Sequence, residues 1–162
     1  MRRFFLKSLI LFSLFSQNAY TTSFKKEGHQ VYAGYRRTCV VKDSMINCVG
    51  LNTYGESLNK KFEKKIKQVA LGANHTCILD EDGVWCFGNN EHRQMNVPLN
   101  LFNTKQITAG ENHTCAIDDE GVKCWGSNRY GQIKVPSKLV NPRQVAAGAK
   151  YTCALDDEGV KC

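Results

Sequence analysis

The stretch that decides the fold is His113–Gln132, HTCAIDDEGVKCWGSNRYGQ. Its two cysteines, Cys115 and Cys124, enclose eight residues, and the same spacing recurs at Cys39/Cys48, Cys77/Cys86 and Cys153/Cys162. Corresponding cysteines of neighbouring pairs lie 38 residues apart along the whole chain. A fixed period of roughly 20–50 residues is typical of architectures in which one small structural unit stacks on the next. The chain is therefore an array of 38-residue units.

Three units have full length, at residues 29–66, 67–104 and 105–142, and a truncated fourth occupies 143–162. The first unit is the most divergent, because Met45 stands where the other units have glycine. Terminal repeats are commonly atypical, since one of their faces does not meet another repeat. The fourth unit ends at Cys162, before the second half of the pattern.

Within a unit the apolar residues follow the pattern of strands. In the second unit we expect strands at 69–71, 75–79 and 84–87, each bounded by turn residues, and a weaker strand at 94–97 that Pro98 ends. No stretch carries apolar residues at helical spacing over three turns. Four short strands in each repeat predict an all-β fold made of small meanders.

The central hairpin of a unit can be predicted residue by residue. If residues 118–121 form a loop, Ile117 lies opposite Val122 and Cys115 opposite Cys124, with Gly121 at a positive φ that glycine adopts without steric cost. Opposed residues of an antiparallel pair have Cβ atoms about 4.5–5.5 Å apart, close to disulfide geometry. The spacing predicts one disulfide within each hairpin, which contributes about 2–3 kcal/mol by loop entropy.

The N-terminal residues differ from the rest of the chain. A basic start at 1–7 precedes an uncharged run of Leu, Ile and Phe at 8–16, and small residues follow. This pattern is typical of an export signal, which we place at 1–23, before a polar leader at 24–28. The apolar run is shorter than the about 20 residues that span a bilayer, so we expect no membrane span once the signal is removed.

Export and the cysteine pairs support each other. All eight cysteines belong to the four pairs, and disulfides persist in oxidising compartments. We therefore expect a secreted, periplasmic or cell-envelope protein. The formal net charge is +7, and much of the excess outside the signal lies in the run Lys60–Lys67. We interpret this run as a solvated connector in preference to a patch for anionic surfaces, and we expect no nucleic-acid partner.

A resemblance to a known family rests on residues that recur in register. The third unit carries Gly110, His113, Thr114, Trp125, Gly126, Asn128, Gly131 and Gln132, which resemble the repeat of the regulator of chromosome condensation family. The second unit keeps Gly72, His75, Thr76, Gly88, Asn90 and Gln94, with Phe87 in place of Trp and Arg93 in place of the last Gly. The first keeps Gly34, Thr38, Gly50, Asn52 and Gly55. The resemblance extends over residues 29–162.

This resemblance implies a β-propeller with blades of four-stranded sheet, usually seven in a ring. Three full units and a half unit cannot close such a ring, which implies a fragment of a longer propeller or one part of an assembly. An open end exposes strand edges and an apolar face, so we also expect a capacity for self-association there. The short repeats look closer to bacterial secreted members, including the beta-lactamase inhibitor protein of this fold, than to the nuclear exchange factor.

The function that these observations favour is an exported, non-enzymatic repeat scaffold for binding another protein, because loops on a rigid scaffold carry function. One alternative is an inhibitor of a secreted or periplasmic enzyme, and another is a non-functional truncated gene product. Guanine-nucleotide exchange, as in the nuclear relative, is opposed by export and by the paired cysteines. No catalytic triad or phosphate-binding loop is recognisable in the sequence, and we expect no cofactor.

Two patterns resemble metal sites. The acidic turns at 80–83, 118–121 and 156–159 lack the further ligands of a calcium loop, so we interpret them as hairpin turns. His75 and His113 each precede a cysteine by two residues, a combination that could bind zinc in a reducing cell. Arg37 and Tyr151 replace them in the other units, which favours a structural role, and we expect no metal.

The candidate partner contacts lie in one repeated loop. Tyr54, His92 and Tyr130 share a repeat position, and Arg93 and Arg129 lie beside it. An aromatic or histidine ring offers contact area with a polar tip. Because the position belongs to the repeat pattern, we favour packing between blades and keep partner contact as the alternative.

Overall fold

The computed structural model describes residues 24–26 and 28–162 as strands, turns and connections, without a helix among them. The expected export signal at 1–23 lies outside this part. The strands are β1 Phe24–Lys26, β2 His29–Gly34, β3 Arg37–Lys42, β4 Met45–Gly50, β5 Asn59–Lys61, β6 Gln68–Leu71, β7 His75–Leu79, β8 Val84–Gly88, β9 Gln106–Ala109, β10 His113–Asp118, β11 Gly121–Gly126, β12 Gln144–Ala147, β13 Thr152–Asp156 and β14 Gly159–Lys161. The described residues hold no helix long and apolar enough to cross a membrane.

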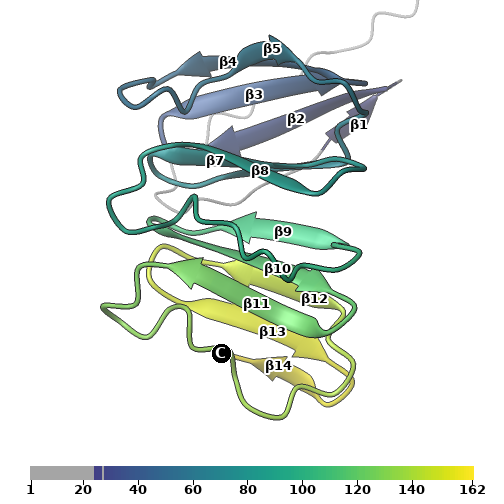
Figure 1. Cartoon of the computed structure of the whole chain (residues 1–162), viewed down its shortest axis with the longest axis vertical. Helices are drawn as coiled ribbons and strands as arrows, with labels where there is room; N and C mark the ends of the chain where they lie inside the picture. The colour runs from purple at the N-terminus through teal and green to yellow at the C-terminus, as the bar shows by residue number, and fades with distance from the viewer. Residues whose placement is uncertain (1–23, 27) are drawn as a thin grey trace, which may run out of the picture.

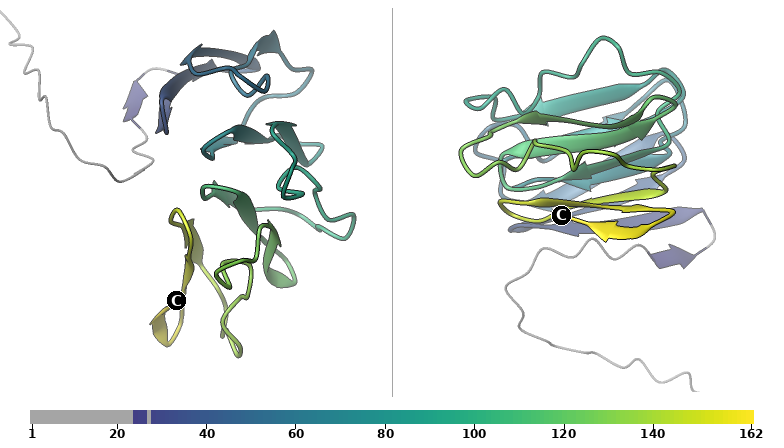
Figure 2. Two further views of the ribbon diagram at one scale, coloured as in Figure 1. Left: turned by 90° about the vertical axis from the view of Figure 1, so that its left-hand side faces the viewer. Right: turned by 90° about the horizontal axis from the view of Figure 1, so that it is seen from below.

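Each repeat unit folds into its own antiparallel sheet, and the sheets stack in an open arc (Figures 1 and 2). The strand orders are β1-β2-β3-β4-β5, β6-β7-β8, β9-β10-β11 and β12-β13-β14, so every sheet is a meander without crossovers. The innermost strands of successive units, β2, β6, β9 and β12, contact one another in turn. This is the blade arrangement of a propeller with an open end.

The core consists of layers between neighbouring sheets. The first layer is the largest and joins the first two units through buried side chains that include Ile46, Val69 and Ile78. The third layer, between the last two units, is built on Cys115, Ile117 and Val145. The layers bury one cysteine of each of the first three pairs completely, because a hairpin staple points its sulfur atoms into the packing between sheets.

The predicted hairpin register is confirmed. Ile117 pairs with Val122 and Cys115 with Cys124, and Gly121 has a φ of 124°. The pairing continues to Asp118 opposite Gly121, so the turn between β10 and β11 holds two residues where the sequence indicated four. All four cysteine pairs are bonded as predicted: Cys39–Cys48, Cys77–Cys86, Cys115–Cys124 and Cys153–Cys162.

The strand predicted at 94–97 is replaced by a turn and irregular chain, so the second sheet has three strands, as do the third and fourth. The backbone there bonds locally, because the Asn96 N–H donates to the Arg93 carbonyl at 3.1 Å and the Met95 N–H to the Asn90 side chain at 3.0 Å. In the first unit the fourth strand does form, as β5 on β4. Its sheet gains a fifth strand from β1, which lies in the stretch that the sequence presents as a patternless leader.

Candidate functional site

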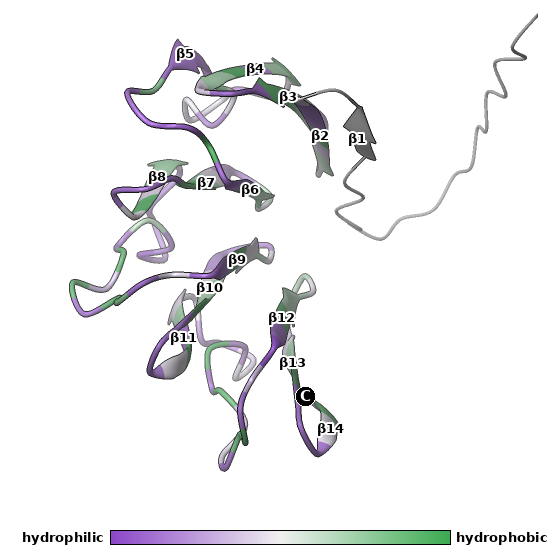
Figure 3. Ribbon diagram, turned by 90° about the vertical axis from the view of Figure 1, so that its right-hand side faces the viewer, coloured by the Kyte–Doolittle hydropathy of each residue, from purple (hydrophilic) through white to green (hydrophobic). Residues whose placement is uncertain are grey.

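The connections of the sheets form two opposite faces of the array. One face, the tyrosine face, holds the loops that follow the first and third strands of each unit, at 35–36, 51–57, 72–74, 89–96, 110–112, 127–134 and 148–151. The other, the hairpin face, holds the acidic turns and the connectors between units, at 43–44, 62–67, 80–83, 98–105, 119–120, 135–143 and 157–158. The tyrosine face lies at the left of Figure 1, and Figure 3 views the hairpin face.

Beneath the tyrosine face, the repeated histidines join one unit to the next. His75 Nε2 lies 2.9 Å from the Thr114 hydroxyl, which donates its own proton to the Gln94 carbonyl at 3.1 Å. Because the hydroxyl has one proton, the histidine must be the donor, which fixes the Nε2–H tautomer. His113 and Thr152 repeat this arrangement at 2.9 Å.

The histidines are neutral in this setting. Burial and the nearby positive charge of Arg37 lower the pKa of His75 to about 3, and burial lowers the pKa of His113 to about 4. Each Nδ1 is buried without a hydrogen-bond partner. Their bonds to Thr114 and Thr152 make these histidines links between the units. Among the described residues no group of three or more His, Cys, Asp or Glu side chains could hold a metal ion.

The motif glycine before each histidine has a packing role. A Cβ placed on Gly72 would come within 2.1 Å of the His75 ring, and one on Gly110 within 2.2 Å of the His113 ring. The ring therefore lies directly on the glycine backbone. Any side chain at this position would displace the histidine from its threonine.

Glutamines provide a second link between the units. The Gln68 side chain donates to the Ile107 carbonyl and accepts from the Ile107 N–H, both at 2.9 Å. Gln106 makes the same two bonds with Val145, each at 2.9 Å. These pairs continue the hydrogen bonding from one innermost strand to the next, where no strand ladder joins the sheets.

The hairpin face uses its carboxylates internally. The buried Asp118 accepts from the Lys123 ammonium at 2.8 Å and from two backbone N–H groups. Burial alone would raise the pKa of Asp118, but these donors hold it below its ordinary value. The equivalent Asp156 accepts hydrogen bonds from the Lys161 ammonium and from the N–H groups of Val140 and Glu158. These donors lower the pKa of Asp156 to about 2.

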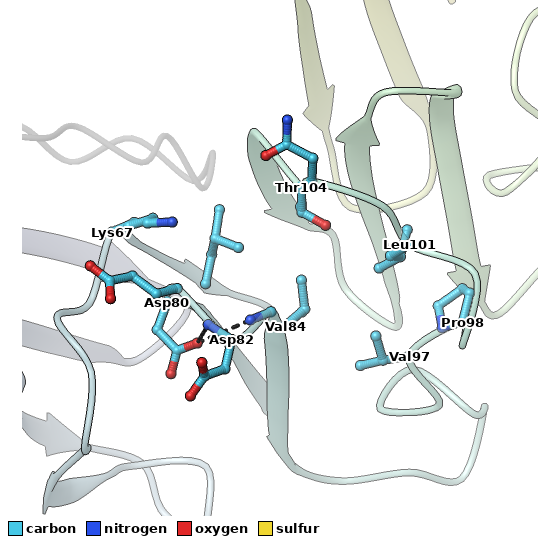
Figure 4. Close-up of a pocket in the computed structure, with 12 residues that line it drawn as sticks. Lys67, Asp80, Asp82, Val84, Val97, Pro98, Leu101 and Thr104 are labelled. Carbon is cyan, nitrogen blue, oxygen red and sulfur yellow. Dashed lines mark hydrogen bonds between the residues drawn. The ribbon is translucent and has the colours of Figure 1, made fainter.

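A recess of about 250 Å³ lies on the hairpin face between the acidic turn of the second unit and the connector at 97–104 (Figure 4). Its most buried carboxylate, Asp80, already accepts from the N–H groups of Asp82 and Gly83 at 2.8 and 3.1 Å and from Trp85 Nε1 at 3.2 Å. These bonds hold the turn and occupy one oxygen of the Asp80 carboxylate. The interpretation of the acidic motif as a hairpin turn accounts for these contacts.

The tyrosine face, in contrast, presents rings and arginines to solvent. Four tyrosines, Tyr35, Tyr54, Tyr130 and Tyr151, are between 48% and 62% exposed. Basic groups lie over two of the rings: the Arg36 guanidinium is 5.1 Å from the centre of Tyr35, and the Lys150 ammonium is 4.6 Å from that of Tyr130. Tyrosine and arginine are among the residues enriched in protein–protein interfaces.

Arg93 occupies an unusual backbone position on this face. Its φ is 63°, whereas the corresponding residues of the first and third units are Gly55 at 79° and Gly131 at 83°. A residue with a side chain in the left-handed region costs on the order of 1 kcal/mol or more. Among the described residues five others share such a backbone: Arg36 on this face, and Asp43, Asn103, Lys138 and Asn141 on the hairpin face. The exposed arginine is therefore held here at a conformational cost.

The loop position singled out from the sequence lies on this face. Tyr54 and Tyr130 are largely exposed, His92 is half-buried, and Arg93 and Arg129 are exposed. Tyr130 also contacts Lys150 of the next unit. The sequence analysis did not identify Tyr35, Arg36, Lys150 and Tyr151 as candidate partner contacts. Their position could have indicated them, because aromatic and basic residues stand there in the loop before the second strand of a unit.

A smaller recess opens beside Tyr130. It has a volume of about 120 Å³ and lies among the loops of the second, third and fourth units. Its lining includes His92, Glu111, Arg129, Tyr130 and Lys150. Basic and aromatic groups from three units therefore converge at one place on the tyrosine face.

Comparison with known proteins identifies the repeat. The model of the regulator of chromosome condensation (RCC1) repeat matches residues 66–94 and 104–132. The fold is similar to that of the CRINKLY WD40 ectodomain of the Arabidopsis thaliana receptor kinase ACR4, with 24% identity and a TM-score of 0.68, over 85% of this chain and 54% of that one. A comparison with curated protein sequences gives no match.

Two further structures share the fold. Prp20p from Saccharomyces cerevisiae is 22% identical, with a TM-score of 0.63, over 81% of this chain and 42% of that one. Human WBSCR16 is 21% identical, with a TM-score of 0.69, over 82% of this chain and 46% of that one. The chain thus spans about half the length of these propeller proteins, and the likeness establishes the fold.

Proposed function

We propose that this chain, which carries regulator of chromosome condensation repeats, is an exported, non-enzymatic scaffold whose tyrosine face binds another protein. The observation that carries the proposal is the composition of that face, where exposed tyrosines and arginines lie in loops held by the buried network beneath them. Rings of this kind add contact area with little loss of side-chain entropy. The propeller fold is consistent with such a scaffold. Because this chain spans about half the length of the similar propeller proteins, it could form part of a longer protein with further repeats.

The backbone position of Arg93 distinguishes its loop from the corresponding loops of the first and third units. Glycine adopts the left-handed conformation in the neighbouring units without strain. An arginine at this position therefore lowers the stability of the protein while it places a positive charge at the surface. The yeast relative offers an analogy, since Prp20p is described with binding properties to Gsp1p and histones and has been crystallised with Kap60 bound. Its partners are proteins.

Site-specific photo-crosslinking tests the binding face. A photoreactive amino acid replaces Tyr130 on the tyrosine face or, as the matched control, the exposed Phe102 on the hairpin face. We expect a discrete protein adduct from position 130 only, and Arg93→Gly should weaken it while raising the stability of the scaffold by up to about 1 kcal/mol. Equal adducts from both positions, or none from position 130, would contradict the proposal.

Export is tested separately through the cysteines. The four bonded pairs fit an oxidising compartment. We expect the protein from its natural host outside the cytoplasm, shortened at its N-terminus and without thiols that react with an alkylating reagent until it is reduced. A full-length, fully alkylated protein in the cytoplasm would refute export.

A further inference from the structure

The recess beside Tyr130 combines the groups that recognise a carboxylate. Arg129 is exposed at its rim, and Lys150 reaches over the Tyr130 ring from the next unit. A guanidinium can bind a carboxylate through two parallel N–H···O bonds, and an ammonium on an aromatic face remains available to a second acceptor. At about 120 Å³ the recess is several times larger than the roughly 10–15 Å³ of cavity that one water molecule needs, so it has room for a carboxylate group.

We propose that this recess receives an aspartate or glutamate side chain from an acidic segment of the partner protein. The inference rests on the proposed function and names the chemistry of its partner. Basic groups continue from the recess across the tyrosine face, with Arg36 and Arg93 in the loops of the first and second units. An acidic segment lying across these loops meets a positive group at each unit, which steers its approach and fixes its register.

The charge pattern favours an acidic protein segment over a nucleic acid. Glu91 and Glu111 lie among the basic residues of this face, and Glu111 lines the recess itself. A regular phosphate backbone is bound by a continuous basic track, which these carboxylates interrupt. A protein segment can place its acidic residues where the arginines and Lys150 lie and neutral residues opposite Glu111.

The glutamate at the recess gives the inference a directional test. Its carboxylate repels an acidic side chain in the recess, so Glu111→Gln should strengthen binding of that side chain by about 2–5-fold. A substitution that improves binding cannot be explained by damage to the fold. The repeat pattern supports tolerance of the change, because Ala73 and Ala149 stand at the same position in the second and fourth units.

The probes are a short glutamate-rich peptide, a lysine-rich peptide of equal length, a single-stranded oligonucleotide, and vesicles of phosphatidylglycerol or phosphatidylcholine. Binding to the full chain is measured by calorimetry at low and physiological salt. We expect the glutamate-rich peptide to bind, and Arg129→Ala with Lys150→Ala to weaken it by about tenfold. The matched control, Lys64→Ala with Lys65→Ala on the hairpin face, removes the same charge and should weaken binding by less than about twofold.

Three outcomes would overturn the inference. An equal loss in the control pair would make binding a matter of net charge. Tighter binding of the oligonucleotide or the phosphatidylglycerol vesicles would assign the face to a nucleic acid or a membrane. Absence of peptide binding, or weaker binding by Glu111→Gln, would remove the recess as a carboxylate site, while the crosslink at position 130 would still decide whether the tyrosine face binds a protein.

Discussion

The first inter-unit interface buries a charged side chain at the repeat position where the second and third bury a neutral ring. Arg37 takes the place of His75 and His113, and its guanidinium donates to the carbonyls of Gly72, Ala73 and His75 in the next unit. The longer side chain thus replaces a histidine–threonine bond with bonds to backbone. The link between the units keeps its position in the repeat, but an arginine and backbone carbonyls form it in place of a histidine and a threonine.

A second substitution accompanies the first. Glu56 stands where the other units have Gln94 and Gln132, and it is fully buried in the same way. Its Oε2 accepts from the Tyr54 N–H at 2.8 Å, as the Gln94 side chain accepts from the His92 N–H at 2.9 Å. The charge of Glu56 raises the pKa of Arg37 against the burial that lowers it, to about 10. The first unit therefore differs from the later units at two positions whose new side chains carry opposite charges. The negative charge of Glu56 partly compensates the burial of the positive charge of Arg37.

The largest expected effect comes from separating this pair. Glu56→Gln or Arg37→His alone removes the attraction between these two buried charges and should destabilise the protein by about 2–3 kcal/mol. Together the two substitutions recreate the His and Gln of the later units, so the double variant should recover most of the loss. Chemical denaturation of the oxidised proteins in a double-mutant cycle measures the coupling. Additive single effects would show that Arg37 and Glu56 are independent.

The later interfaces should be sensitive to acid in a way that the first is not. The pKa values of His75 and His113, about 3 and 4 when folded, lie below the 6.5 of an unfolded histidine. As the pH falls, the two histidines therefore become protonated in the unfolded chain at a higher pH than in the folded protein. The stability that is present above pH 6.5 is lost as the pH falls. Between pH 6.5 and 5.5 the two histidines together should lower the free energy of unfolding by about 2 kcal/mol.

Denaturation at these two pH values checks the size of the acid effect, and NMR of the histidine rings checks its origin. We expect the rings of His75 and His113 to remain neutral at pH 5.5 in the folded protein. Amide hydrogen exchange should increase more in β7 and β10, which carry the two histidines, than in β3, which carries Arg37. A ring of either histidine that titrates near 6.5 would refute the explanation.

The features that the sequence predicts are those set by local pattern. The spacing of Cys115 and Cys124 defines the hairpin, its register and its disulfide, because opposed residues in a tight antiparallel pair are determined by the loop alone. The family motif then implies the stacking of sheets. The same reasoning identified one loop position of the tyrosine face, at Tyr54, His92 and Tyr130.

The features that the sequence did not predict depend on partners distant in the chain. The bond between His75 and Thr114 joins residues 39 apart, and nothing in the local pattern distinguishes such a histidine from a metal ligand. The strand expected at 94–97 gave way to turns because the Asn90 side chain and local carbonyls satisfy the backbone. Exposure of the tyrosines likewise depends on how neighbouring units place their loops.

The smallest expected effect compares the two tryptophans. Trp125 is buried, and its Nε1 donates to the Gln94 carbonyl at 2.9 Å, whereas Phe87 fills this position in the second unit. Trp125→Phe should cost about 1 kcal/mol, because Thr114 still donates to that carbonyl and no group is left unpaired. Trp85→Phe should cost less, about 0.5 kcal/mol, since Trp85 is 48% exposed and the Asp80 oxygen that accepts from its Nε1 keeps the Asp82 and Gly83 N–H donors. Denaturation midpoints of both variants measure the difference, and an equal cost would mean that the Trp125 bond adds nothing to the link between the second and third units.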